Sequence, residues 1–203
     1  VNEVTDLLQR GMIIVAGGTI AVMVFNLPWR YIYLAVVPAF AVGSGMIPVC
    51  SAAYGQRNLA KMEEGFRFSL AFVGVSTALT AALFFLLADP LMTFVSYEET
   101  VAEARPQLIW MMQMCSLIVP ALALKSLGSS MMQAMKKPRT ALYFTIAWGF
   151  MKLGAYAAVC QISFEAVVYA MVAVYWFGGI FMMAVAFSRF RGLKAGFDGP
   201  APA

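Results

Sequence analysis

The chain has 203 residues, of which 62% are hydrophobic and only 12% are charged. Soluble domains carry about 25% charged residues, so this composition does not suit a soluble globule and indicates lipid as the main solvent. The net charge of +4 arises from basic residues in short loops rather than along one stripe. This distribution argues against a nucleic-acid-binding protein.

Long uncharged segments predict the membrane-spanning helices. A helix needs about 20 apolar residues to cross the hydrocarbon core of a bilayer. Five segments meet this requirement, at residues 31–56, 68–88, 107–135, 140–164 and 166–188. Two of them contain a single charge, Lys125 in the third and Lys152 in the fourth. We therefore predict an all-α polytopic transmembrane helix bundle with five full spans and a partial or short first helix.

The first helix has two possible interpretations. Residues 11–27 are uncharged, but Gly17 and Gly18 lie in the middle of this segment and favour an interruption. One interpretation is a short first span. The other is a partial helix over residues 2–16, a turn at the glycine pair, and a second helix over residues 19–54.

Basic residues predict the orientation of the bundle. They form three islands, at residues 57–67, 136–139 and 189–194. The loop over residues 89–105 is mainly acidic. Lys and Arg are retained on the cytoplasmic side of membrane proteins, so the islands and the C-terminus are expected inside the cell. We expect one multi-pass bundle over residues 1–194 in the plasma membrane, and a flexible cytoplasmic tail over residues 195–203.

Small residues predict one helix contact, because they let helix backbones approach closely in lipid. They recur every four residues on two successive spans, as Ala35, Ala39 and Gly43 and as Gly74, Ala78 and Ala82. We expect these two faces to meet.

Prolines within the spans predict kinks. Pro38 and Pro48 in one segment and Pro120 in another each remove a backbone hydrogen-bond donor. Broken helices are typical of transporters, but ordinary structural kinks also produce this pattern, so the prolines favour a transporter only slightly.

The two lysines within spans have different expected roles. Lys152 is near the middle of its span, where a charge normally faces a cavity or an ion-pair partner. Lys125 is closer to the cytoplasmic end, and we expect its long side chain to extend toward the membrane surface.

An enzyme is not expected. The sequence has no histidine, and Cys50, Cys115 and Cys160 are far apart and lack a CxxC spacing. No acidic residue lies in the middle of a secure span, and no metal site is expected.

Two stretches of the sequence contain prolines and glycines at characteristic positions. The first reads WRYIYLAVVPAFAVGSGMIPVCSAAYGQRNLAKMEEGFRFSLAF, and the second reads PALALKSLGSSMMQAMKKPRTALYF. The residues to compare are Trp29, Arg30, Pro38, Gly43, Gly45, Gly55, Gln56, Asn58, Pro120 and Pro138. With these residues, the two stretches resemble the multidrug and toxic compound extrusion (MATE) family of efflux antiporters. The resemblance extends from about residue 17 to residue 194.

The resemblance implies a half-transporter. Members of the family have two lobes of six helices, with a substrate cleft between the lobes that opens alternately to each side. This chain looks like the C-terminal lobe alone, and would need an N-terminal lobe from the same gene or from a second chain. The implied activity is export of drugs or other organic cations in exchange for Na+ or H+, with no cofactor beyond that coupling ion. Membrane lipids are the other expected partner.

The resemblance also implies which residues act. Carboxylates on the first and fourth helices of the second lobe serve as coupling-ion sites in some members. Here the first of these helices has Glu3 and Asp6, and the fourth has no acid. Substrate binding is expected at polarizable, aromatic and polar side chains facing the cleft. These are Trp110, Met111, Gln113, Met114 and Lys152.

Two alternatives stay open. One is a nontransporting membrane fragment or assembly subunit, whose helices pack but move nothing. The other is a flippase for lipid-linked precursors with a similar fold. A flippase predicts a more basic central cavity, with Lys125 and Lys152 both pointing into it.

Overall fold

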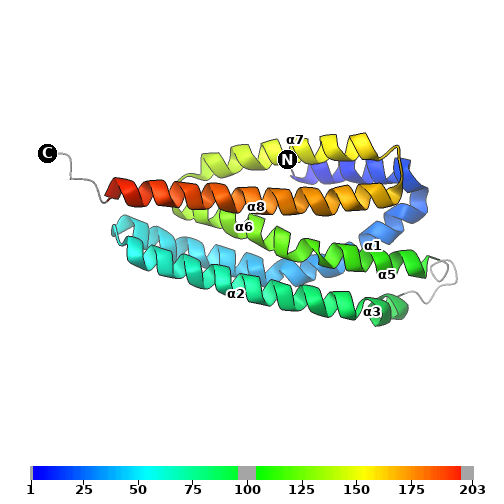
Figure 1. Ribbon diagram of the computed structural model, residues 1–203, viewed down its shortest axis with the longest axis horizontal. Coiled ribbons are helices and arrows are strands. Elements are labelled where there is room, and N and C mark those ends of the chain that lie inside the picture. The colour runs from blue at the N-terminus through cyan, green and yellow to red at the C-terminus, as the bar shows by residue number, and fades with distance from the viewer. Residues whose placement is uncertain (1, 96–103, 198–203) are drawn as a thin grey trace.

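The computed structural model describes residues 2–95 and 104–197, which form an elongated helical bundle with no β-strand among them (Figure 1). The helices are α1 (Asn2–Gly55), α2 (Leu59–Leu86), α3 (Ala88–Val95), α5 (Arg105–Ser116), α6 (Ile118–Ala134), α7 (Pro138–Val159) and α8 (Phe164–Phe197). Five helical segments are long and apolar enough to cross a membrane, at Ile20–Gly55, Leu59–Leu86, Arg105–Ala134, Pro138–Val159 and Phe164–Lys194. The predicted all-α bundle of five spans and a short first helix is therefore confirmed.

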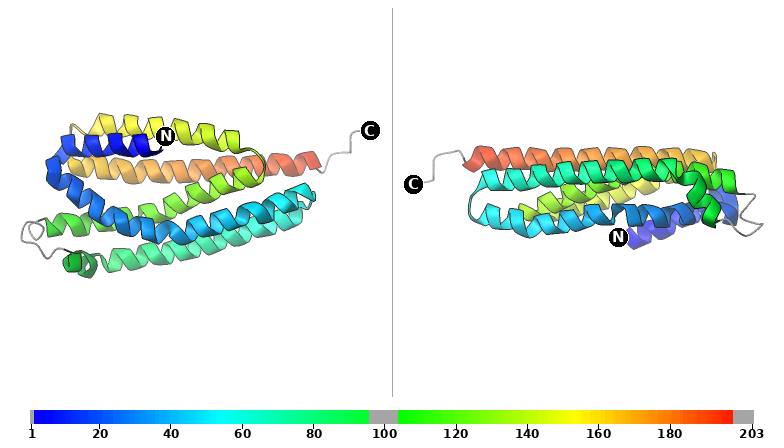
Figure 2. Two further views of the ribbon diagram at one scale, coloured as in Figure 1. Left: turned by 180° about the vertical axis from the view of Figure 1, so that it is seen from behind. Right: turned by 90° about the horizontal axis from the view of Figure 1, so that it is seen from below.

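Gly18 divides α1 into two helices. Its backbone angles are φ 70° and ψ −164°, a combination open almost only to glycine. The chain reverses there, so that the first helix runs back along the bundle (Figure 2). In this first helix the Gln9 side-chain amide donates to the Met171 sulfur of α8, at 3.7 Å. The structure thus confirms the interpretation with a partial helix, a turn and a second helix.

We expect Gly18→Ala to lower the free energy of unfolding by about 1–3 kcal/mol, because alanine is strained in this backbone conformation. Gly45→Ala is the matched control, since it is on the same element and an added Cβ meets no atom within 4 Å at either position. The control should raise stability by about 0.5–1 kcal/mol, because alanine favours a helix more than glycine does. Thermal unfolding in detergent tests both predictions. Equal shifts of the unfolding temperature in the two variants would contradict the strained backbone conformation assigned to residue 18.

One of the predicted proline breaks is present. The third span is interrupted at Leu117, between α5 and α6, three residues before Pro120. Pro120 has no N–H to donate to the Ser116 carbonyl, so the helix cannot continue unchanged. The Trp176 indole of α8 donates to the neighbouring Leu117 carbonyl at 3.0 Å and so joins α8 to the break. By contrast, α1 continues through Pro38 and Pro48, and Gly18 is its non-helical residue.

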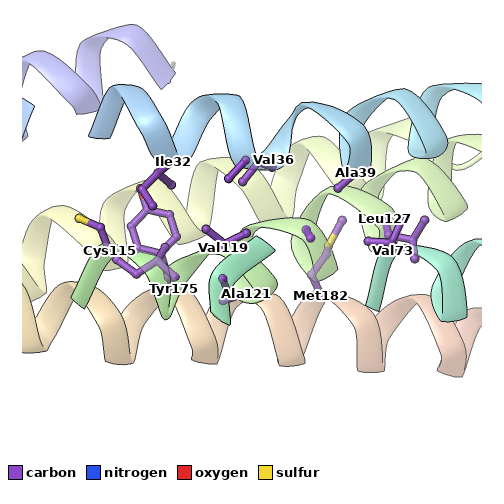
Figure 3. Close-up of a cluster of buried hydrophobic side chains, with 14 of the residues drawn as sticks. Ile32, Val36, Ala39, Val73, Cys115, Val119, Ala121, Leu127, Tyr175 and Met182 are labelled. Carbon is purple, nitrogen blue, oxygen red and sulfur yellow. The ribbon is translucent and has the colours of Figure 1, made fainter. Parts of the chain in front are cut away.

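Helix α6 is at the centre of the core, between α1, α2 and α8. Figure 3 shows side chains from these helices packed together, among them Val36, Val73, Leu127 and Met182. Glycines bring α6 and α8 close: a Cβ on Gly179 would lie 2.6 Å from the Ala121 carbonyl oxygen. This close approach fixes two walls of the cavity described below.

The expected contact between the two small-residue faces is wrong. A Cβ on Gly43 would lie 2.9 Å from the Ser130 hydroxyl, so this face of α1 packs on α6. On α2 the small residues Gly74, Ala78 and Ala82 are exposed, while Phe66, Val73 and Thr77 are buried. A four-residue spacing identifies a helix face but does not show which neighbour that face meets, and here a different face of α2 is buried.

The three basic islands share one end of the bundle. Both the α1–α2 turn and the α6–α7 turn are at this end, together with the C-terminal part of α8 (Figure 1). The Lys194 ammonium lies 3.2 Å from the Glu63 carboxylate, which joins the first island to the third. Which leaflet this end faces stays a prediction. Helix α8 runs to Phe197, and residues 198–203 of the expected tail lie outside the described residues.

Candidate functional site

A cavity of about 420 Å³ lies between α1, α6, α7 and α8. Its lining comprises Tyr33, Phe40, Leu122, Lys125, Ser126, Ser129, Ser130, Gln133, Thr145, Trp148, Lys152, Tyr175 and Met182. A larger groove, of about 820 Å³, lies on the outside of α1 and α2 beside Glu63 and Arg67. We regard the smaller cavity as the candidate site, because its two charged residues, Lys125 and Lys152, lie well inside membrane-spanning segments, where charges mark functional positions. The charged residues of the larger groove lie near the beginning of α2 instead.

One face of α6 provides the polar side of the cavity. Lys125, Ser126, Ser129, Ser130 and Gln133 recur at intervals of three or four residues, which places them on the same side of a helix. Hydroxyl, amide and ammonium groups therefore form a polar stripe along an otherwise apolar span.

Helix α7 contributes Trp148, which is nearly buried. Its indole nitrogen donates to the Val174 carbonyl of α8 at 3.5 Å, and its ring meets the Tyr175 ring edge-on at 5.3 Å. Gly178 leaves the space that the indole occupies, because a Cβ there would overlap the indole nitrogen. The Trp148 ring is thus held in place by α8.

Two lysine side chains converge on this ring. The Lys125 ammonium lies 3.3 Å from the centroid of the Trp148 ring, and the Lys152 ammonium lies 5.3 Å from it. A cation over an indole face is attracted by about 0.5–2 kcal/mol. Lys152 is only 2% exposed. The expectation that Lys125 extends toward the membrane surface is wrong, since the indole face draws its ammonium into the cavity.

The five predicted substrate-binding residues are not gathered at one place. Lys152 lines the cavity, whereas the four residues on α5 do not. Met111 is fully buried in the core, and Gln113 and Met114 are half-buried. Trp110 packs against Tyr169 at 5.7 Å and lines a separate pocket of about 430 Å³ with Glu165. Binding of substrate at these α5 residues stays a prediction.

The predicted coupling-ion residues, Glu3 and Asp6, lie in the first turns of α1, but their side chains lie outside the described part of the chain. Their role stays a prediction. Within residues 2–95 and 104–197, no group of acidic and cysteine side chains has the arrangement of a metal site.

The residues that carry the family resemblance are mostly structural in position. Trp29 stacks on Phe25 at 5.3 Å and lies 5.9 Å from Tyr175, next to the cavity. Gly43 allows the close approach to Ser130. The others lie on exposed or half-buried positions of helices and turns, namely Arg30, Pro38, Gly45, Gly55, Gln56, Asn58, Pro120 and Pro138.

Sequence reasoning missed several lining residues, above all Trp148 and the hydroxyl-bearing face of α6. A signal for the α6 residues was present. Ser126, Ser129, Ser130 and Gln133 follow Lys125 at helical spacing within an apolar span, and polar residues at that spacing indicate a face that avoids lipid.

Comparisons with known proteins agree with this architecture. The MatE family profile matches residues 7–151 of the chain. A MATE structure in the bent conformation superposes with a TM-score of 0.89 at 20% identity, covering 97% of this chain and 44% of that one. An inward-facing multidrug resistance MATE transporter of the MOP superfamily gives a TM-score of 0.87 at 21% identity, covering 95% of this chain and 44% of that one.

A third solved structure is a MOP superfamily transporter from Pyrococcus furiosus, described as having a binding pocket of reverse polarity that suggests a different function. It gives a TM-score of 0.87 at 21% identity, covering 95% of this chain and 43% of that one. By these coverages the chain spans less than half the length of the solved structures that it resembles. No curated protein matches the chain.

The fold is that of membrane transporters built from a bundle of spanning helices. The profile match extends over more than half of the sequence, and the chain belongs to the MatE family.

Proposed function

We propose that this chain is the C-terminal lobe of a secondary transporter that works by alternating access with a first lobe of similar size. The chain corresponds to about 44% of a solved MATE chain, which supports a missing lobe. The observation that carries the proposal is the cavity between α1, α6, α7 and α8, which brings two charged residues together inside the membrane-spanning bundle. Charges at such positions are costly and are normally retained for transport or binding.

The proposed mode is export of an organic solute in exchange for Na+ or H+ at the plasma membrane. Glu3 and Asp6 are the proposed coupling-ion residues, because they are the carboxylates of the first helix. This helix lies against the bundle, where Gln9 and Ile13 are buried one and two turns further on. Movement of the helix on ion binding would be passed to the walls of the cavity through these contacts.

The proposal is tested in sealed vesicles that hold the chain with and without a first lobe from a MatE relative. Uptake is followed for a cationic dye and for a fluorescent alkyl phosphate, under imposed Na+ and proton gradients. We expect gradient-driven uptake of one probe only when both lobes are present. Absence of gradient-driven uptake of either probe would favour a nontransporting fragment or assembly subunit.

The carboxylates are tested in the same vesicles. Removing both charges (E3Q with D6N) should abolish the acceleration by the gradient, because no group remains to bind the coupling ion. Glu64→Gln is the control, since Glu64 is an exposed acid on α2. Unchanged coupling in E3Q/D6N would overturn the assignment of these residues.

A second candidate function, a flippase for lipid-linked precursors, is favoured by one observation. Lys125 and Lys152 line the same cavity, and an organic cation there would meet two like charges. The electrostatics of the cavity therefore support negatively charged substrates over the organic cations that the family resemblance implies.

A further inference from the structure

We propose that Lys125, Trp148 and Lys152 form a subsite for the phosphate or carboxylate group of an amphiphilic substrate. This inference rests on the proposed transporter function, and it names the part of the substrate that the cavity binds. The subsite is called the lysine–indole site below.

The first argument is electrostatic. Both ammonium groups lie near one indole ring, at 3.3 Å and 5.3 Å from its centroid, so their separation cannot exceed the sum of these two distances. Like charges repel, and the repulsion grows in the low-dielectric interior of a bundle. An anion bound beside both ammonium groups replaces part of this repulsion with attraction. Lysine is a common partner of phosphate groups, as a point charge with three donors.

The second argument is the supply of neutral donors around the lysines. Ser126 and Ser129 lie on the same face of α6 as Lys125, and the Ser129 hydroxyl accepts from the Gln133 amide at 3.4 Å, so its own proton can be donated to an anion. A phosphate or carboxylate has more acceptor sites than two ammonium groups fill. Hydroxyl groups at this spacing can complete its hydrogen bonds without adding charge.

The third argument is the rigidity of the ring. Trp148 is fixed against α8 by its bond to the Val174 carbonyl and by the space at Gly178. A fixed ring holds both lysine side chains through cation–π contacts, so fewer rotamers are lost when an anion binds. The lysine–indole site is therefore preorganised for binding.

The fourth argument concerns the remainder of the substrate. Tyr33, Phe40, Leu122 and Met182 form an apolar wall of the same cavity. A volume of about 420 Å³ falls within the range of small-molecule sites and exceeds what a single inorganic ion requires. An amphiphile, with its anionic group at the lysines and its apolar part on this wall, fits both sides.

The test measures binding directly, with the purified full chain in lipid nanodiscs and without a first lobe or an ion gradient. Isothermal titration calorimetry compares hexyl phosphate, hexyltrimethylammonium and inorganic phosphate. We expect hexyl phosphate to bind most tightly. Lys125→Gln and Lys152→Gln should each weaken its binding about tenfold, because each removes one charge-assisted contact. Lys125→Arg should retain binding, since the charge is kept.

Lys61→Gln is the matched control, because it removes an exposed lysine of α2 outside the cavity. Thermal unfolding checks that each variant is folded, and Lys125, which is only half-buried, carries the test if Lys152→Gln unfolds. Tighter binding of hexyltrimethylammonium, or unchanged hexyl phosphate binding in both lysine variants, overturns the proposal. Equal affinity for inorganic phosphate overturns the assignment to an amphiphile and indicates a soluble anion.

Failure of this binding test is distinguishable from failure of the proposed function. Binding without gradient-driven uptake in the two-lobe vesicles would retain the lysine–indole site and overturn the transporter. Uptake of the cationic dye without binding of hexyl phosphate would retain the transporter and overturn the lysine–indole site.

Discussion

Trp148→Ala is expected to lower the free energy of unfolding by about 3–5 kcal/mol, the range for removing a large aromatic side chain from a packed interior. The indole fills the space beside Gly178, packs on Tyr175 and attracts two lysine side chains. Its loss leaves a cavity next to α8 and removes the ring that attracts the two ammonium groups. Thermal unfolding in detergent measures the effect.

Phe150→Ala is the matched control for this prediction. Phe150 is on the same helix but is 72% exposed in the bundle, so its removal should change stability by no more than about 0.5 kcal/mol. A second control combines substitutions: Gly178→Ala should be costly when Trp148 is present and nearly neutral in the Trp148→Ala background, because the clash is with the indole. Equal costs in the two backgrounds would contradict the packing described for this ring.

The spans, the turn at Gly18 and the common end of the basic islands could all be predicted from the sequence. Each follows from a local property: the length of an uncharged segment, a glycine pair that interrupts it, or lysine and arginine in a short loop. Such properties do not depend on how the helices are rotated about their axes. These three features could therefore be predicted before any contact between helices was known.

The rotation of each helix about its axis, which decides the face that is buried, could not be predicted in the same way. Gly74, Ala78 and Ala82 have the spacing of a contact face, yet α2 buries Val73 and Thr77 instead. Which face is buried depends on the shapes of the neighbouring helices. Large apolar side chains are exposed as well as buried along α2, so hydrophobic periodicity gives little guidance on this helix.

The candidate site shows the same limit. Lys152 could be expected in a cavity because a mid-span charge is costly in lipid. The position of Lys125 could not, because it is set by the indole of Trp148, which Gly178 of a third helix admits. The site thus depends on a contact between residues that are distant in the sequence.

Gly179→Ala should lower the free energy of unfolding by about 1–3 kcal/mol, the usual cost of overpacking an interior. The added Cβ would lie 2.6 Å from the Ala121 carbonyl oxygen, a backbone atom that cannot rotate away, so α6 and α8 must separate. Gly192→Ala on the same helix is the control, since its Cβ meets no atom within 4 Å and should raise stability slightly. Leu122 of α6 and Met182 of α8 both line the cavity, and their separation should also weaken hexyl phosphate binding. Unchanged thermal unfolding of Gly179→Ala would show that the two helices are not in contact at this position.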